Sequence, residues 1–148
     1  MSTTTTGRII TASISSIKKL NCDEIWQITR SDKVITGNKW VSELAPGWDL
    51  FNQYLHNWKG KPPEEWWHLC AQAYNEELQS EVKLAALRRL WSLVNYGKVI
   101  GLVCFCPVDR YCHRRLVAEF LHKHGIVAEE YSDPASQRDE SVVQALLF

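Results

Sequence analysis

Seven residues that can attack, exchange protons or bind ions lie within eleven consecutive positions of the C-terminal half of the chain. In chain order they are Cys104, Cys106, Asp109, Arg110, Cys112, His113 and Arg114. Thiols and imidazoles serve as nucleophiles, proton carriers and metal ligands, and guanidinium groups bind phosphates and carboxylates. The sequence therefore predicts chemistry in this segment, and three interpretations of it compete.

The first interpretation is a site for a phosphorylated or nucleotide-like anionic ligand, in an enzyme or a binding protein. The apolar run 98–106 (KVIGLVCFC) predicts a buried central strand, and helical spacing resumes at Tyr111. The N-terminus of that helix would favour an anion at the carboxyl end of the strand. We expect His113 to face an open cleft as acid, base or hydrogen-bond donor, with Arg110 or Arg114 holding the anion.

Other residues belong to the same predicted site. Further candidate catalytic residues are Cys112 and Asp109, and further candidate ligand contacts are Cys104, Cys106, Thr11 and Ser13. Thr11 and Ser13 qualify because they end the first predicted strand, which commonly neighbours the ligand crevice of such sheets. Arg114 and Arg115 are adjacent on the helix, so at most one of them can face the site.

The second interpretation is thiol catalysis. Cys104 and Arg110 have the C-x5-R spacing with which cysteine phosphatases surround an oxyanion, and a helix N-terminus lowers the pKa of a thiol. The loop contains no glycine, however, and Pro107 removes one amide that such a cradle needs.

The third interpretation is a zinc site formed by Cys104, Cys106, Cys112 and His113. We expect the C-x-C spacing to oppose a zinc site unless Cys106 has already left the strand. A fourth possibility involves no ligand: small buried thiols and solvated arginines at the start of a surface helix.

Composition narrows the class of protein. The chain has 148 residues, which suits one domain over 1–148, with a flexible segment 1–7 and a linker and apolar tip over 132–148. Seventeen basic residues balance seventeen acidic ones, which excludes a uniformly basic nucleic-acid coat and makes nucleic acid an improbable partner. Within this neutral chain, the segment 98–125 is locally positive, with five basic and two acidic residues.

Two partner hypotheses remain open. A protein- or nucleic-acid-binding domain would use the arginine-rich helix, and a homodimer or partner contact would use the tip Val142–Phe148. No run of 18 apolar residues and no signal-like N-terminus is present, so we expect no membrane contact and a cytoplasmic protein.

The elements that must position these residues alternate between strands and helices. Strands are predicted over 8–14, 23–29, 98–106 and 126–131, and helices over 48–58, 64–78, 81–95 and 111–124. In the helix 48–58, the residues predicted to face the core are Trp48, Phe51, Leu55 and Trp58. The order predicts an α/β fold, a small Rossmann-like and mainly parallel sheet with a helical insertion between the early strands and the central strand.

Four segments of the chain carry a family resemblance. They are IITASISSIKKL, WVSELAPGWDLFNQYLHNW, EEWWHLCAQAYNEEL and VIGLVCFCPVDRYCHRRLVAEFL. Together, over about Arg8 to Ala128, they resemble the domain-of-unknown-function family number 488, which includes the bacterial YeaO-like proteins. The resemblance implies a small α/β domain and assigns no activity.

The resemblance also bears on the three interpretations. It implies that an acidic residue and a histidine recur at the positions of Asp109 and His113, often without the thiols, and that other members carry the Cys112-His113-Arg114 triplet. On that basis zinc is not a family-wide requirement, and His113 is a better functional candidate than any cysteine.

Overall fold

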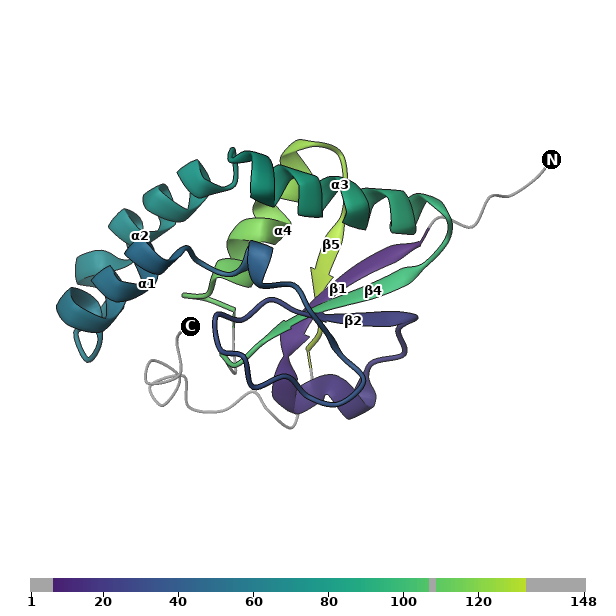
Figure 1. The fold of residues 1–148 in the computed structure, drawn as a ribbon, viewed down its shortest axis with the longest axis horizontal. Helices are drawn as coiled ribbons and strands as arrows, with labels where there is room; N and C mark the ends of the chain where they lie inside the picture. The colour runs from purple at the N-terminus through teal and green to yellow at the C-terminus, as the bar shows by residue number, and fades with distance from the viewer. Residues whose placement is uncertain (1–6, 107–108, 133–148) are drawn as a thin grey trace.

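The computed structural model describes residues 7–106 and 109–132, which form a parallel sheet with helices (Figure 1). The strands are β1 (Arg8–Ser13), β2 (Glu24–Gln27), β3 (Lys39–Trp40), β4 (Val99–Cys104) and β5 (Ala128–Glu130). The α-helices are α1 (Trp48–Gln53), α2 (Pro63–Glu77), α3 (Glu81–Asn95) and α4 (His113–Lys123). Shorter helical segments are η1 (Ile14–Lys19), η2 (Ser42–Leu44) and the π-helical η3 (Tyr54–Trp58).

The strands lie in the order β3-β2-β4-β1-β5, and every pair is parallel. β4 is central, pairing Ser13 of β1 with its own Cys104 and Gln27 of β2 with its Val103. The apolar run of β4 is buried on both faces, as its uniform composition indicates. The α/β class predicted from the sequence is confirmed, and the described sheet is wholly parallel.

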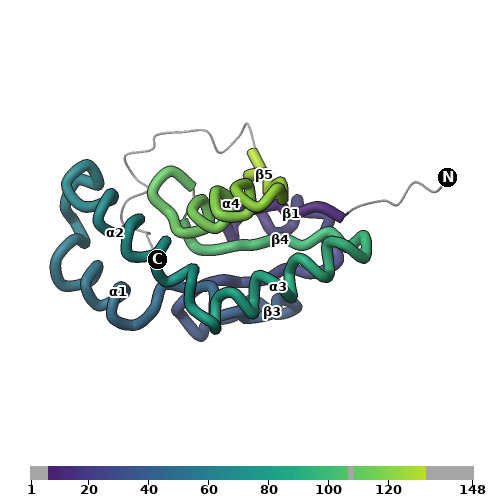
Figure 2. The backbone as a smooth tube through the Cα atoms, turned by 90° about the horizontal axis from the view of Figure 1, so that it is seen from above, coloured from purple at the N-terminus to yellow at the C-terminus, as the bar shows by residue number. Residues whose placement is uncertain are grey.

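Helices α3 and α4 lie side by side over the same face of the sheet (Figure 2). Alternation along the strands turns Ile9, Ile100 and Leu102 toward these helices, where they join one hydrophobic core. The opposite face of β4 contacts the connection that follows η1: a Cβ built on Gly101 would lie 3.2 Å from Cys22 Sγ. A side chain at position 101 would therefore crowd this connection.

The insertion between β3 and β4 projects beyond the carboxyl edge of the sheet as a pair of helical segments (Figure 1). Trp66 of α2 anchors it, stacking on Trp58 with ring centroids 5.6 Å apart and meeting Tyr54 edge-on at 5.5 Å. Pro63 begins α2, where its missing N–H costs nothing. The predicted helical insertion is thus observed, and it places α2 beside the carboxyl edge.

The first helix of the insertion departs from the prediction. A single helix over 48–58 was expected with Trp48 and Leu55 facing the core, but α1 passes into η3 at Tyr54 and these two side chains are 61% and 40% exposed. The buried side chains are instead Leu50, Tyr54 and Trp58, spaced four residues apart. That stripe fits the observed contacts with Trp66, and the predicted stripe is wrong.

Other differences concern short elements and chain ends. Helix α3 has the predicted bounds, whereas each predicted strand is one to three residues shorter at one or both ends. The two-residue strand β3 was not predicted, because Lys39 and Trp40 give no alternating pattern. The predicted flexible segment 1–7, except residue 7, and the predicted tip, beyond residue 132, lie outside the described residues. Among the described helices, none is long and apolar enough to cross a bilayer.

Candidate functional site

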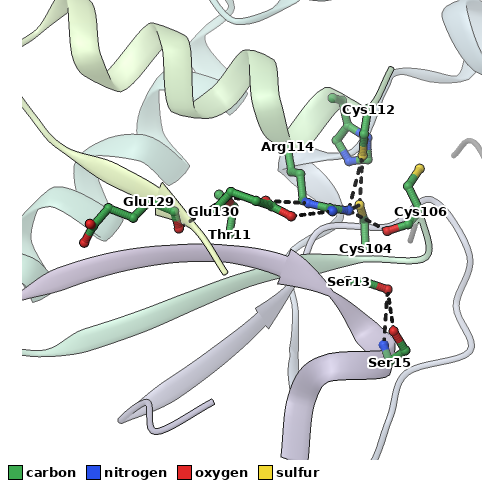
Figure 3. Close-up of polar contacts among 10 residues, drawn as sticks. Thr11, Ser13, Ser15, Cys104, Cys106, Cys112, Arg114, Glu129 and Glu130 are labelled. Atoms are coloured by element: carbon green, nitrogen blue, oxygen red, sulfur yellow. Dashed lines mark hydrogen bonds and ion pairs between the residues drawn. The ribbon is translucent and has the colours of Figure 1, made fainter. Parts of the chain in front are cut away.

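Three thiols meet at the carboxyl edge of the sheet (Figure 3). Cys104 ends β4, Cys106 lies two residues further on, and Cys112 is the N-cap residue of α4. Their sulfur atoms all lie within 4.8 Å of one another, and the three side chains are buried. The expectation that the C-x-C spacing opposes such a cluster is wrong, because residues two apart on a strand point to the same face and Cys106 lies beyond the end of β4.

The closest contact in this cluster joins Cys104 and Cys112, whose Sγ atoms are 2.9 Å apart. Uncharged heavy atoms pack at roughly 3.5–4.0 Å, so this separation indicates a hydrogen bond between the two sulfurs. All five cysteines of the chain are free thiols or thiolates in this structure.

The Arg114 guanidinium, fully buried in the first turn of α4, connects the thiols to the sheet. Its Nη1 donates to the Cys106 carbonyl at 2.7 Å and to Cys104 Sγ at 3.1 Å. Its Nε and Nη2 donate to the two carboxylate oxygens of Glu130, at 3.0 and 2.7 Å. This forked geometry fixes the guanidinium in one position, with every nitrogen already engaged by the protein.

Glu130 is in turn held by the first strand. The Thr11 hydroxyl donates to Glu130 Oε1 at 2.7 Å, and β1 and β5 pair at this same residue. Thr11 therefore contacts the site through Glu130. Arg115, the neighbour of Arg114, is exposed and pairs with Glu119 at 3.1 Å, so only one of the adjacent arginines faces the thiols, as predicted.

The charges around Cys104 favour its ionised form. Burial alone would raise the pKa of this thiol, but the hydrogen bonds from Cys106 and Cys112 and the charge of Arg114 hold its pKa well below the usual range. Burial raises the pKa of Cys112 well above the usual range, and the negative charge of Cys104 adds to that effect. The neighbouring Cys112 thiol and the Arg114 guanidinium thus favour the thiolate form of Cys104.

His113 does not face an open cleft, and that expectation is wrong. Its ring is 1% exposed, its Nε2 lies 2.7 Å from the Ile28 carbonyl, and Tyr74 of α2 packs edge-on against it. A carbonyl only accepts, so Nε2 carries the proton and Nδ1 presents its lone pair, 3.8 Å from Cys112 Sγ. Burial lowers the pKa of His113, which keeps the ring neutral.

The other predicted residues lie nearby without joining the thiols. Asp109 accepts through its backbone carbonyl from the Cys112 amide at 3.2 Å. Arg110 is exposed, with its guanidinium 5.8 Å from the Tyr111 ring. Ser13, paired in register with Cys104, accepts from the amide and the hydroxyl of Ser15 at 3.3 and 3.0 Å.

Two contributors were missed by the sequence analysis. Glu130 was not among the predicted site residues, although it lies near the end of the last predicted strand, on the same sheet edge as Cys104. The Ile28 carbonyl, which fixes the His113 tautomer, could not be predicted, because a backbone carbonyl is present at every residue type.

A groove between two of the helices does not contain these residues. It has a volume of about 370 Å³ and lies between α3 and α4, lined mostly by apolar side chains: Leu84, Leu87, Arg88, Trp91, Phe120, Leu121, His124 and Ile126. The thiols are at the opposite end of α4, beside its first turn.

The cluster has part of what a metal would need. Three sulfurs lie close enough to share an ion, and His113 Nδ1 is a possible fourth ligand. The Arg114 guanidinium, 3.1 Å from Cys104 Sγ, places a fixed positive charge where a zinc ion would need negative ligands. The donor set fits zinc, and the charge distribution does not.

Comparison with protein-family models gives one match. The model DUF488-N3a, described as the active DUF488-N3 subclade, matches residues 9–125. Comparisons with curated proteins and with solved structures gave no match.

Proposed function

This chain belongs to the DUF488-N3a family, and from that premise we propose that it is a small-molecule enzyme whose reacting group is the Cys104 thiolate. The description of the subclade as active supports an enzyme rather than a structural module. A thiolate is the nucleophilic form of cysteine, so an ionised Cys104 is the group in this cluster best suited to attack a substrate.

One observation carries the proposal: Arg114 Nη1 lies 3.1 Å from Cys104 Sγ while Glu130 holds the same guanidinium from the other side. A buried arginine with only a carboxylate partner would be a structural ion pair. Here the guanidinium also contacts a sulfur, and Cys112 donates to the same sulfur. Two donors on one thiol stabilise its anion and raise the fraction of reactive thiolate at neutral pH.

The substrate that we propose is a phosphorylated or nucleotide-like anion, and its access to Cys104, which is buried in the described conformation, requires the side chains around this sulfur to rearrange. Cys104 contacts the N-cap residue of α4, so a substrate at Cys104 would lie beside the positive end of that helix. Arg110, exposed just before the helix, adds a cation on the same side. Arg114 would contribute through Cys104 rather than by binding the substrate, because its nitrogens are engaged.

Ultraviolet absorbance of the thiolate tests the proposal without requiring a reagent to reach a buried sulfur. The full chain should show thiolate absorbance at neutral pH, Cys104→Ser should lose it, and Cys70→Ala should retain it. Cys70 is the matched control because it is equally buried, while burial raises its pKa to about 12.

Turnover is then measured against a panel of nucleotides and sugar phosphates. Cys104→Ser should abolish any activity found, and Cys70→Ala should preserve it. Absence of the thiolate signal in the wild-type chain, or activity that survives Cys104→Ser, would show the proposal to be wrong.

A zinc site is the second candidate, favoured by the three sulfurs within 4.8 Å of one another. Zinc would bind Cys104, Cys106 and Cys112, with His113 Nδ1 completing a tetrahedral set. Elemental analysis of the purified chain decides between the two: one zinc per chain, lost in Cys106→Ala, would support this candidate and replace the nucleophile.

A further inference from the structure

We propose that Cys104 and Cys112 form a reversible disulfide when a small hydroperoxide oxidises Cys104, so that the site also reduces peroxides. The inference rests on the proposed function, since it requires Cys104 to be a thiolate. It adds a second substrate class, a hydroperoxide, and gives Cys112 a role beyond its hydrogen bond to Cys104.

The distance between the two sulfurs is the first argument. They are 2.9 Å apart, and a disulfide bond is about 2.05 Å long, so closure requires a relative movement of less than about 1 Å. The two residues belong to different elements, since Cys104 ends β4 and Cys112 precedes α4.

The different ionisation of the two thiols is the second argument. Arg114 contacts Cys104 at 3.1 Å but Cys112 at 3.8 Å, so the guanidinium favours the thiolate on Cys104. This asymmetry separates an attacking sulfur from a resolving sulfur, which remains protonated until it is needed.

The third argument is a proton acceptor beside Cys112. His113 Nδ1 lies 3.8 Å from Cys112 Sγ, and the Ile28 carbonyl holds the proton of the ring on Nε2. The imidazole can therefore accept the Cys112 proton when that sulfur reacts. The burial of His113, which argues against direct contact with a ligand, suits this internal role.

The electrons and protons balance in two steps. The Cys104 thiolate attacks the terminal oxygen of the hydroperoxide and the O–O bond breaks. Cys104 becomes a sulfenic acid, and the leaving alkoxide or hydroxide takes one proton from solvent and departs as the alcohol or water. Cys112 passes its proton to His113 and attacks Cys104 Sγ; the S–O bond breaks, and the departing hydroxide takes the proton as water. An external dithiol returns the disulfide to two thiols.

Burial selects the oxidant. The Cys104 and Cys112 side chains are 1% and 0% exposed, which excludes a bulky protein disulfide as the direct oxidant in this conformation. Hydrogen peroxide is little larger than water and is the probe for the experiment.

The sequence makes the cross-link easy to identify. Trypsin cleaves after Lys98, Arg110 and Arg114, so Cys104 and Cys106 fall in peptide 99–110 and Cys112 falls in peptide 111–114. After treatment of the native full chain with equimolar hydrogen peroxide, its mass should fall by that of two hydrogen atoms. After digestion with trypsin, the two peptides should be found by mass spectrometry as one linked species. A dithiol should separate them.

Variants separate the steps. Cys106→Ser should still form the cross-link, but more slowly, because Cys106 supports the Cys104 thiolate without being one of the bonded pair. Cys70→Ala should keep the wild-type rate as the matched buried control. Cys112→Ala should instead stop at a sulfenic acid on Cys104, seen as one added oxygen that a dimedone probe captures. Repeated cycles with a dithiol should consume hydrogen peroxide in the wild-type chain, with at least a tenfold loss in Cys112→Ala.

Three outcomes would overturn this inference. They are a Cys104–Cys106 bond, which leaves peptide 99–110 unlinked and lighter by two hydrogens; no oxidation at all; and zinc bound to the thiols that prevents oxidation. If thiolate absorbance is present but no cross-link forms, this inference fails and the proposed function stands. If the thiolate signal is absent, both fail.

Discussion

The ion pair between Arg114 and Glu130 offers the sharpest test of how the site is held together. In Glu130→Gln the side chain keeps its shape, and the amide oxygen can still accept from the Thr11 hydroxyl. What disappears is the negative charge opposite a guanidinium that is 0% exposed. Because Arg114 cannot return to water while α4 stays folded, the variant carries an uncompensated buried cation.

The expected cost is set by that burial. Removing one partner of a buried pair costs about 3–5 kcal/mol. The Glu130 side chain retains 27% exposure, so water can partly replace the lost charge and we expect about 3 kcal/mol. For a chain of this length that corresponds to a fall in Tm of about 10 °C. Urea denaturation followed by circular dichroism measures the change in the free energy of unfolding directly.

Glu119→Gln is the matched control, since the same substitution is made opposite the next arginine of the same helix. Arg115 and Glu119 are 47% and 54% exposed, so the loss should be about 0.5 kcal/mol or less. If the two variants lose equal stability, the idea that Arg114 depends on Glu130 for its charge balance is wrong. Thiolate absorbance of Cys104 should also change in Glu130→Gln and not in Glu119→Gln.

Three further perturbations test the surrounding structure. Tyr74→Phe should cost about 1–3 kcal/mol in urea denaturation, because the hydroxyl donates to the buried Leu44 carbonyl at 2.6 Å. Ser80→Ala should cost about 1 kcal/mol in the same assay, because Ser80 caps α3 by accepting from the Lys83 amide at 3.3 Å. Lowering the pH below 6.5 should destabilise the fold by up to about 1.4 kcal/mol per pH unit from His113 alone, since burial lowers its pKa in the folded state and the unfolded chain takes up the proton first.

Each of these has a control on the surface. Tyr96→Phe removes a hydroxyl from a side chain that is 85% exposed, and Ser92→Ala removes one from the exposed face of α3; both should be neutral within about 0.5 kcal/mol. For the pH series the control is His68→Gln, a substitution at an exposed position, and the stability of this variant should change with pH as that of the wild-type chain does. Equal effects in a variant and its control would contradict the corresponding prediction.

The parts of the fold that sequence could predict are those with long, repeated patterns. The apolar run over 98–106 predicted a central strand that is covered on both faces. Ser80 and the apolar helix face that follows it predicted the bounds of α3. The face of α1 was misjudged because aromatic residues occur on both of its sides. Which side chains of this segment are buried depends on which aromatic ring contacts Trp66, and residue spacing alone does not decide that.

The residue types predicted which groups lie close together, but not how they are connected. The crowding of cysteines, histidine and arginines pointed to the loop and helix start where the three thiols meet. Which groups would be exposed did not follow, because burial of His113 and Arg114 depends on α2 and on the last strand, both distant in sequence. A charged residue after an apolar strand gives the same pattern whether it meets solvent or a buried partner.

The position of Glu130 in the chain has a consequence for biosynthesis. Thr11 and β1 are made early, but their partners β4 and β5 follow about ninety and one hundred and twenty residues later. A ribosome-bound chain that stops before residue 130 has Arg114 without its carboxylate, so Cys104 cannot acquire its final surroundings until translation has passed the fifth strand.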